Sequence, residues 1–168
     1  MENIIRWGHY LLCIGLAACQ PTFTPEKESI NPIEVQTIQT TGYQLTLVQT
    51  EDICLLKAKK QAILETYPLT LTTPCFFISD DDAVHIETYP DWNIQAVIIM
   101  AGDTLSPTRR TKWGIKHKEH CGDQIQAIII QHGQIQLTDR IDKTAVCQRD
   151  DLDEKAFRNF VYNNNLVK

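Results

Sequence analysis

Alternating and continuous apolar runs divide most of the chain into predicted β-strands. In residues 43–49 apolar and polar side chains alternate, which is the period-two pattern of a half-buried strand. Residues 94–100 are a predominantly apolar run that ends before Gly102, and this pattern favours a central strand. Further strands are predicted at residues 75–78, 84–89, 125–130 and 135–138. The last two flank His132-Gly133, which predicts a tight hairpin turn with the glycine at positive φ.

Residues 53–66 fit two different patterns. The apolar spacing fits one face of a helix, but the same residues also fit two strands that turn at 59–61. We favour the hairpin because Pro68 and the threonine-rich residues 69–73 continue the chain in an extended style.

The hydrophobic period changes near the C-terminus, where an amphipathic helix is predicted. Asp150 or Asp151 caps this helix, and Asp153 and Glu154 lie in its first turn, where the helix dipole favours negative charge. Its apolar face consists of Leu152, Ala156, Phe157, Phe160 and Val161. We therefore predict an α+β fold, a mainly antiparallel sheet with a C-terminal amphipathic helix laid on it.

The N-terminus has the pattern of a targeting segment. A weakly positive stretch that contains Arg6 precedes residues 10–18, which are uncharged and mostly apolar. This apolar stretch is too short for a transmembrane helix, because a bilayer core needs about 20 helical residues. A cleaved signal is therefore favoured over a permanent membrane span.

The end of this segment, Leu16-Ala17-Ala18-Cys19, resembles the lipobox of bacterial lipoproteins. The resemblance implies that residues 1–18 are removed, and that Cys19 is lipidated and becomes the first residue of the mature protein. It also implies a membrane-tethered protein outside the cytoplasm. In Gram-negative members of that family Gln20, rather than Asp, after the cysteine favours sorting to the outer membrane, where the protein would face the periplasm.

Residues 19–41 are predicted to be the lipidated cysteine and a flexible linker. They are rich in Pro, Thr and charge without a sustained period, so they bury too little surface to offset their ordering entropy. A coil of about 20 residues spans roughly 25 Å. The globular domain is then residues 42–168, although a late strand at 33–38 would move this boundary.

Cysteine usage predicts two disulfides in that domain. Of the six cysteines, Cys13 leaves with the signal and Cys19 carries lipid, so four remain in an oxidising compartment. Four cysteines allow three pairings. We favour the sequential one, because each bridge then staples a local unit: Cys54 with Cys75 and Cys121 with Cys147.

Two metal sites are alternatives to these interpretations. His117, His120 and Cys121 could bring two imidazoles and a thiolate to zinc, but we favour a disulfide with two solvent-facing histidines. The acidic run 80–82 with Glu87 could bind calcium, but it lacks the spaced ligands and the glycine of a calcium loop. We therefore expect a solvated acidic turn, and neither a metal nor a cofactor.

Charge and motif content narrow the function further. The chain has 16 basic and 21 acidic residues, a formal net charge of -5, and removal of residues 1–18 deletes one of each. This balance argues against nucleic-acid binding. The sequence holds no nucleophile elbow, zinc-protease motif, dinucleotide fingerprint or phosphate loop. We expect a protein that is not an enzyme.

One basic and aromatic segment stands out from the acidic chain. It consists of Arg109, Arg110, Lys112, Trp113, Lys116 and Lys118. Flanking Pro and Gly residues predict a loop here, and arginine and tryptophan are the residue types that dominate binding energy at protein interfaces. The charge would steer an anionic partner. In the alternative interpretation this is an ordinary solvated loop, with Trp113 folded into the core.

These features together favour a lipid-anchored outer-membrane protein that faces the periplasm and binds a protein partner. In layout it is similar to periplasmic inhibitor and immunity lipoproteins, which block a toxin or hydrolase. One alternative is an accessory or assembly lipoprotein of an envelope or secretion machine. The least favoured is an envelope hydrolase or metal binder that uses His85, His117 or His120.

Overall fold

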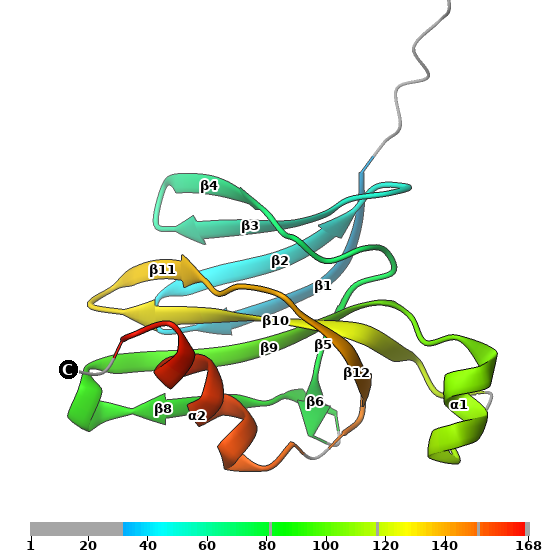
Figure 1. The fold of residues 1–168 in the computed structure, drawn as a ribbon. Helices are drawn as coiled ribbons and strands as arrows, with labels where there is room; N and C mark the ends of the chain where they lie inside the picture. Colours follow the sequence, from blue (N-terminus) through cyan, green and yellow to red (C-terminus); the bar gives the residue numbers. More distant parts are fainter. Residues whose placement is uncertain (1–31, 81, 117, 151, 167–168) are drawn as a thin grey trace, which may run out of the picture.

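The computed structural model describes residues 32–166, except residues 81, 117 and 151. Two antiparallel β-sheets stack on each other, and a C-terminal helix covers the far face of the second sheet (Figure 1). This arrangement confirms the predicted α+β fold. None of the described helices is long and apolar enough to cross a membrane. Cys19 and the rest of the lipobox lie outside the described residues.

The first sheet has the order β1-β2-β3-β4. Its strands are β1 (Ile33–Thr40), β2 (Tyr43–Gln49), β3 (Cys54–Lys60) and β4 (Ile63–Pro68). The second sheet has the order β11-β10-β9-β5, with β12 beside β10 and β8 beside β9. Its strands are β5 (Phe76–Phe77), β8 (Ile86–Tyr89), β9 (Ile94–Thr104), β10 (Cys121–Gln131), β11 (Gln134–Leu137) and β12 (Ile141–Cys147).

Shorter elements lie between the strands of the second sheet or follow its last strand. They are the ladder of β6 (Ser79–Asp80) with β7 (Ala83–Val84), the 3₁₀ turn η1 (Pro90–Trp92), and the helices α1 (Pro107–Trp113) and α2 (Glu154–Asn163). Helix α1 projects from one end of the second sheet, and η1 lies at the other end (Figure 1).

Strands β9 and β10 form the centre of the second sheet, and both of their faces are buried. The side chains that face the first sheet are Ala96, Ile98, Met100, Ile128 and Ile130. Those that face α2 are Val97, Ile99, Ala101, Ala127 and Ile129. Burial on both faces explains why residues 96–101 are all apolar, and it confirms the predicted central strand.

The first sheet contributes its inner face to the same core, and polar contacts join the two sheets at one end. Leu45, Leu47 and Leu56 are fully buried between the sheets. The Tyr43 hydroxyl donates a hydrogen bond to the Gly133 carbonyl oxygen at 2.7 Å, and Lys60 Nζ donates to the same oxygen at 3.0 Å. The turn between β10 and β11 is therefore held against the first sheet.

Both predicted hairpins are present. Strands β3 and β4 pair from Leu55 to Lys60, which confirms the hairpin over the helix at 53–66, and Gln61 takes a φ of 55° in the turn. In the second hairpin His132 and Gly133 have φ values of 53° and 72°. Two consecutive positive φ angles match the twist of the flanking strands, which is why this turn can be so short.

The predicted domain start at residue 42 is wrong. Strand β1 pairs with β2 from Ile33 opposite Gln49 to Thr40 opposite Tyr43, so residues 33–40 belong to the folded domain. The alternative of a late strand at 33–38 is therefore correct. An edge strand needs few apolar side chains to be held, and here Ile38 packs against the core while the Gln36 Oε1 atom accepts a hydrogen bond from Phe77 N.

Helix α2 has the predicted apolar face but a different cap. Phe157, Phe160 and Val161 are buried, with Leu152 and Ala156 packed at the margin of the same cluster. The Asp153 carboxylate caps the helix, because it accepts a hydrogen bond from Lys155 N at 2.6 Å.

The prediction of Asp150 as this cap is wrong, because its carboxylate instead accepts a hydrogen bond from Cys147 N at the end of β12. Asp151, the other predicted cap, lies outside the described residues. Asp150 and Asp151 both fitted the residue preference for a helix cap. Hydrophobic periodicity gave no sign that the Asp150 carboxylate bonds to Cys147 N instead.

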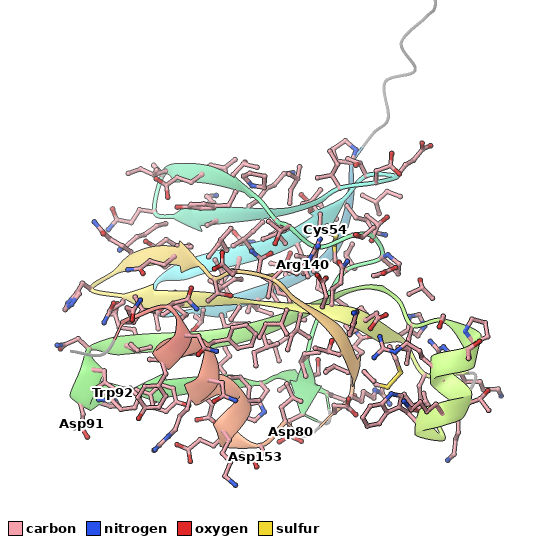
Figure 2. All side chains as sticks on the ribbon, viewed as in Figure 1. Cys54, Asp80, Asp91, Trp92, Arg140 and Asp153 are labelled. Carbon is pink, nitrogen blue, oxygen red and sulfur yellow. A yellow bond between two sulfur atoms is a disulfide. The ribbon has the colours of Figure 1, made fainter. Side chains whose placement is uncertain are left out.

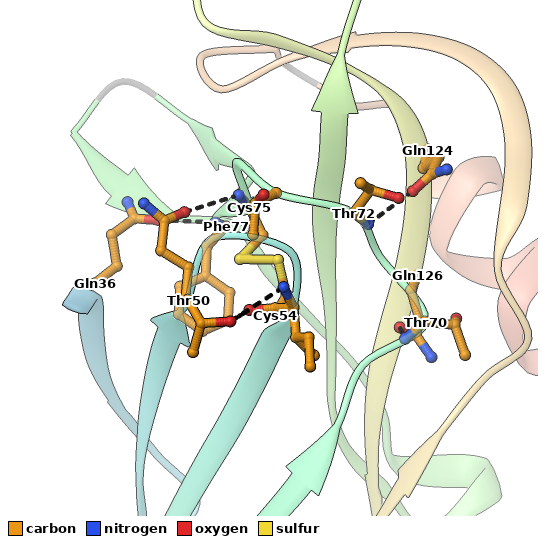
Figure 3. Close-up of a disulfide and its surroundings, with 12 residues drawn as sticks. Gln36, Thr50, Cys54, Thr70, Thr72, Cys75, Phe77, Gln124 and Gln126 are labelled. Carbon is orange, nitrogen blue, oxygen red and sulfur yellow. Dashed lines mark hydrogen bonds between the residues drawn. A yellow bond between two sulfur atoms is a disulfide. The ribbon is translucent and has the colours of Figure 1, made fainter. Parts of the chain in front are cut away.

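The predicted disulfide pairing is confirmed. Cys54 bonds to Cys75, which ties the start of β3 to the segment before β5 (Figure 3). Cys121 bonds to Cys147, and these two residues are direct register partners of β10 and β12. Each bridge therefore closes a local unit of the fold.

The segment between β4 and β5 crosses from one sheet to the other in close contact with the central strands. Thr70 N donates to Gln126 Oε1 at 3.0 Å, and Thr72 N donates to Gln124 Oε1 at 2.9 Å (Figure 3). Gly102 of β9 lies against this segment, and a Cβ atom there would be 2.7 Å from the Thr72 carbonyl oxygen. Glycine is required here by the close approach of two backbones.

We expect Gly102→Ala to destabilise the fold by about 1–3 kcal/mol, the usual cost of forcing an extra methyl group into a packed site. Urea unfolding followed by circular dichroism measures this loss. Thr104→Ala, at the exposed end of the same strand, is the control and should change stability by about 0.5 kcal/mol or less. Equal stability of the two variants would contradict the close approach at Gly102.

The burial of Tyr89 predicts that the stability of the fold decreases at alkaline pH. Its side chain is 7% exposed, its hydroxyl has no hydrogen-bond partner in the described part of the chain, and burial raises its pKa from 10.0 to about 12. Between pH 10 and 12 the unfolded chain loses this proton first, so stability falls as pH rises. We expect Tyr89→Phe to unfold less readily than the original chain at pH 11, with little change at pH 8, in urea titrations at both values.

Candidate functional site

The basic segment forms a short helix, α1, and the prediction of a loop is wrong. The Ser106 Oγ atom accepts a hydrogen bond from Arg109 N, Pro107 occupies the first turn, and Gly114 ends the helix with a φ of 68°. Proline just inside the start and glycine just past the end are helix boundaries as much as loop signals. The prediction took these two residues as the flanks of a loop.

Trp113 is the last residue of α1, and it is 60% exposed. The alternative in which Trp113 folds into the core is therefore wrong. Lys112, Lys116 and Lys118 are exposed beside it. Lys112 and Trp113 lie on α1, which projects from the molecule (Figure 1), and Lys116 and Lys118 lie in the segment that follows it. We call these four exposed residues the α1 surface.

Arg109 has a structural role at the base of α1. Its guanidinium forms an ion pair with Asp123 and donates a hydrogen bond to the Lys143 carbonyl oxygen at 2.8 Å. Both partners belong to strands of the second sheet, β10 and β12. Arg109 therefore ties α1 to the sheet, and its contact with a partner stays a prediction.

Arg110 holds the chain on both sides of the helix. Its guanidinium donates to the carbonyl oxygens of Leu105 at 3.2 Å, Lys116 at 3.3 Å and Glu119 at 2.9 Å. The charged guanidinium thus gives three backbone carbonyl oxygens a hydrogen-bond donor from the protein. Arg110 thus shapes the α1 surface, and its predicted contact with a partner stays a prediction.

The base of α1 rests on a small apolar cluster and a disulfide. Leu105, Cys121 and Cys147 are buried together, with Ile115 and Ala145 packed against them. Because Cys121 begins β10 and Cys147 ends β12, the bridge fixes the two strand ends that support the helix. The α1 surface is therefore presented on a rigid base.

A hollow of about 530 Å³ lies beside this base. Its lining includes Lys118, Glu119, His120, Arg149 and Asp150, from the segments that precede β10 and follow β12. The sequence interpretation missed Arg149 and Asp150 as part of this site. The predicted bridge between Cys121 and Cys147 was the available signal, because it places the residues on either side of the two cysteines next to each other.

The same region contains His120 and Cys121, two of the three residues of the zinc alternative. His117 lies outside the described residues, and Cys121 is bonded to Cys147. The Glu119 carboxylate lies within 4.8 Å of both sulfur atoms, but the thiolate, and not the disulfide, is the metal ligand. The trio therefore supplies one anionic ligand, Glu119, while the bridge is intact.

The acidic run of the calcium alternative has its own partners. Asp82 pairs with Arg149 at 3.4 Å, and Glu87 pairs with His85 at 2.9 Å. Asp80 is exposed in β6, and residue 81 lies outside the described part. The ring of His85 also packs on Phe157 at 4.5 Å, so His85 and His120 have different surroundings.

Replacement of Arg110 tests how the base is built. We expect Arg110→Met to remove the guanidinium donor from three carbonyl groups, and to destabilise the protein by about 1–3 kcal/mol. Amide hydrogen exchange should speed up in residues 105–120 more than elsewhere. Lys112→Met, which removes an exposed charge on the same helix, is the control and should leave both quantities nearly unchanged.

The α1 surface thus depends on contacts between segments that are distant in sequence. Arg109 reaches Asp123 and Lys143, and the disulfide joins positions 121 and 147. The chain was compared with protein families, with curated proteins and with solved structures, and none of them matches it.

Proposed function

We propose that this protein is a lipid-anchored binding protein of the outer membrane, facing the periplasm, whose α1 surface docks a protein partner with an acidic surface. The observation that carries the proposal is Trp113, 60% exposed on a helix whose base is fixed. An indole in water at a rigid site is a ready anchor for a partner's apolar recess.

The rigid base favours tight binding. Association costs free energy for each side chain and loop that must be ordered, and a surface ordered beforehand avoids part of that cost. At the α1 surface Arg109, Arg110 and the Cys121–Cys147 bridge already hold the backbone. Binding would then need to order little more than the side chains of Trp113 and the neighbouring lysines.

Charge indicates the chemistry of the partner. Lys112, Lys116 and Lys118 are exposed on a chain whose formal net charge is -5. A local basic surface on an acidic protein attracts an acidic partner and orients its approach, which raises the association rate more than the final affinity. The partner we propose is an acidic toxin or hydrolase that this protein inhibits by covering it.

The membrane anchor supports the same function. Leu16-Ala17-Ala18-Cys19 resembles a lipobox, and a lipid on Cys19 would tether the domain through the residues that precede β1, which begins at Ile33. Strand β1 starts at the end of the strands that carries α1 (Figure 1). The anchor would thereby keep the binding surface close to the membrane.

The test is a pull-down with the lipidated full chain, followed by affinity measurements on the protein retained. We expect Trp113→Ala to weaken that complex at least about tenfold, in the range of an interface anchor. Leu64→Ala is the matched control, since Leu64 is 61% exposed but lies on β4. Equal affinities of the two variants would contradict the proposal.

Charge reversal separates the steering role from anchoring. Lys112→Glu and Lys116→Glu should slow association and reduce its dependence on salt. Arg109→Glu is unsuitable, because it would place a second carboxylate against Asp123 and disturb the base. Recovery of a one-to-one complex with an acidic secreted protein supports the inhibitor function, whereas recovery only in a large envelope assembly favours the accessory function.

A further inference from the structure

The end of the second sheet away from α1 carries two hollows that share Asn93 and His132. One, of about 420 Å³, is also lined by Asp91, Trp92 and Asn165, and the other, of about 460 Å³, by Thr88 and Gln95. Trp92 ends η1, at the start of β9, whereas α1 follows the end of β9. These hollows are thus separate from the α1 surface, and we call them together the Trp92 hollow.

Three segments that are far apart in sequence build the Trp92 hollow, and glutamine side chains fix them. Gln131 Nε2 donates to the Trp92 carbonyl oxygen at 2.9 Å and to the Leu166 carbonyl oxygen at 3.3 Å. Gly133 N donates to Gln95 Oε1 at 2.6 Å. The η1 turn, the β10–β11 turn and the segment after α2 therefore hold fixed positions, which is what a preformed ligand site requires.

An aromatic group supports one side of the hollow. The Trp92 ring lies 5.2 Å from the Tyr89 ring and 5.5 Å from the Tyr162 ring, and the Arg158 guanidinium carbon lies 5.8 Å from the Trp92 ring centre. Figure 2 shows Trp92 beside Asp91 at this end of the molecule. These three neighbouring side chains hold the half-buried indole in place, and the indole also lines the hollow.

The polar groups around the indole are mostly uncharged. Asn93, Asn165 and His132 offer planar side chains that donate and accept hydrogen bonds, and Asp91 is the carboxylate among the lining residues. The hollow beside α1 differs, because Lys118, Glu119, Arg149 and Asp150 line it. A site with one indole and several amides suits a ligand that has apolar C–H faces and many neutral hydroxyl or amide groups.

We propose that the Trp92 hollow binds a neutral oligosaccharide. The C–H face of a pyranose ring would pack on the indole, and its hydroxyl groups would exchange hydrogen bonds with Asn93, Asn165 and His132. Asp91 would accept hydrogen bonds from two adjacent hydroxyl groups. This site and the α1 surface are independent, so either can fail without the other.

Tryptophan fluorescence gives a direct test in the full chain. The chain has three tryptophans, Trp7, Trp92 and Trp113, so the W7F/W113F variant reports on Trp92 alone. We titrate this variant with chitotetraose and, in a second arm, with maltotetraose. A saturable change in Trp92 emission with either sugar is the expected result, and no saturable change with both sugars would overturn the proposal.

Three residues with nearly equal positive φ angles allow matched glycine substitutions for this experiment. Asn93, Asn165 and Gln61 have φ values of 54°, 55° and 55°, which glycine adopts without strain. Asn93→Gly and Asn165→Gly, each in the W7F/W113F background, therefore remove a side-chain amide and keep the turn. Gln61→Gly makes the same change in the β3–β4 turn.

We expect at least a tenfold weaker affinity for Asn93→Gly and for Asn165→Gly, and no change for Gln61→Gly. Retention of full affinity in both asparagine variants would overturn the placement of the sugar in the hollow. Circular dichroism and the unfolding midpoint confirm that each variant is folded, so that a lost response reports on the site.

Discussion

The burial of β9 and β10 on both faces is the constraint on which the rest of the structure depends. Each fully buried isoleucine in this pair contributes about 1.5–3 kcal/mol relative to an exposed one, and the pair exposes neither face. The first sheet and α2 are the two covers of this pair. Each cover is held in place by its packing on the apolar side chains of β9 and β10.

The same pair sets the distance between the two candidate sites. The eleven residues of β9 separate η1 from the segment that leads to α1, and an extended strand of that length spans roughly 35 Å. The two ends differ in chemistry. Lysines, carboxylates and a disulfide surround α1, whereas amides and aromatic rings surround Trp92. The two binding proposals therefore concern opposite ends of the same strand pair.

Local patterns predicted those features that depend on neighbours along the chain. The strands, both hairpins and the apolar face of α2 follow from period and turn chemistry. The pairing of Cys54 with Cys75 and of Cys121 with Cys147 followed from the preference for local bridges. At β1 the pattern was too weak, because an edge strand is covered on one side and needs few apolar residues.

The candidate sites were less predictable, because their contacts join distant segments. The tryptophan and lysines of the α1 segment were found by composition, but the structural role of Arg109 depends on Asp123 and Lys143. Nothing in the local sequence around Trp92 indicates that Asn165 will lie beside it. Such proximity is a product of the assembled fold, and a linear pattern does not contain it.

Each disulfide closes its own stretch of chain, and α1 lies between the two stretches. A protease that cut this exposed helix after Lys112 would leave two fragments with no disulfide between them, one ending in α1 and the other carrying β10. The β9–β10 ladder would then be the main link between the fragments. Strand pairing and side-chain packing, and no covalent bond, would then hold the two parts of the core together.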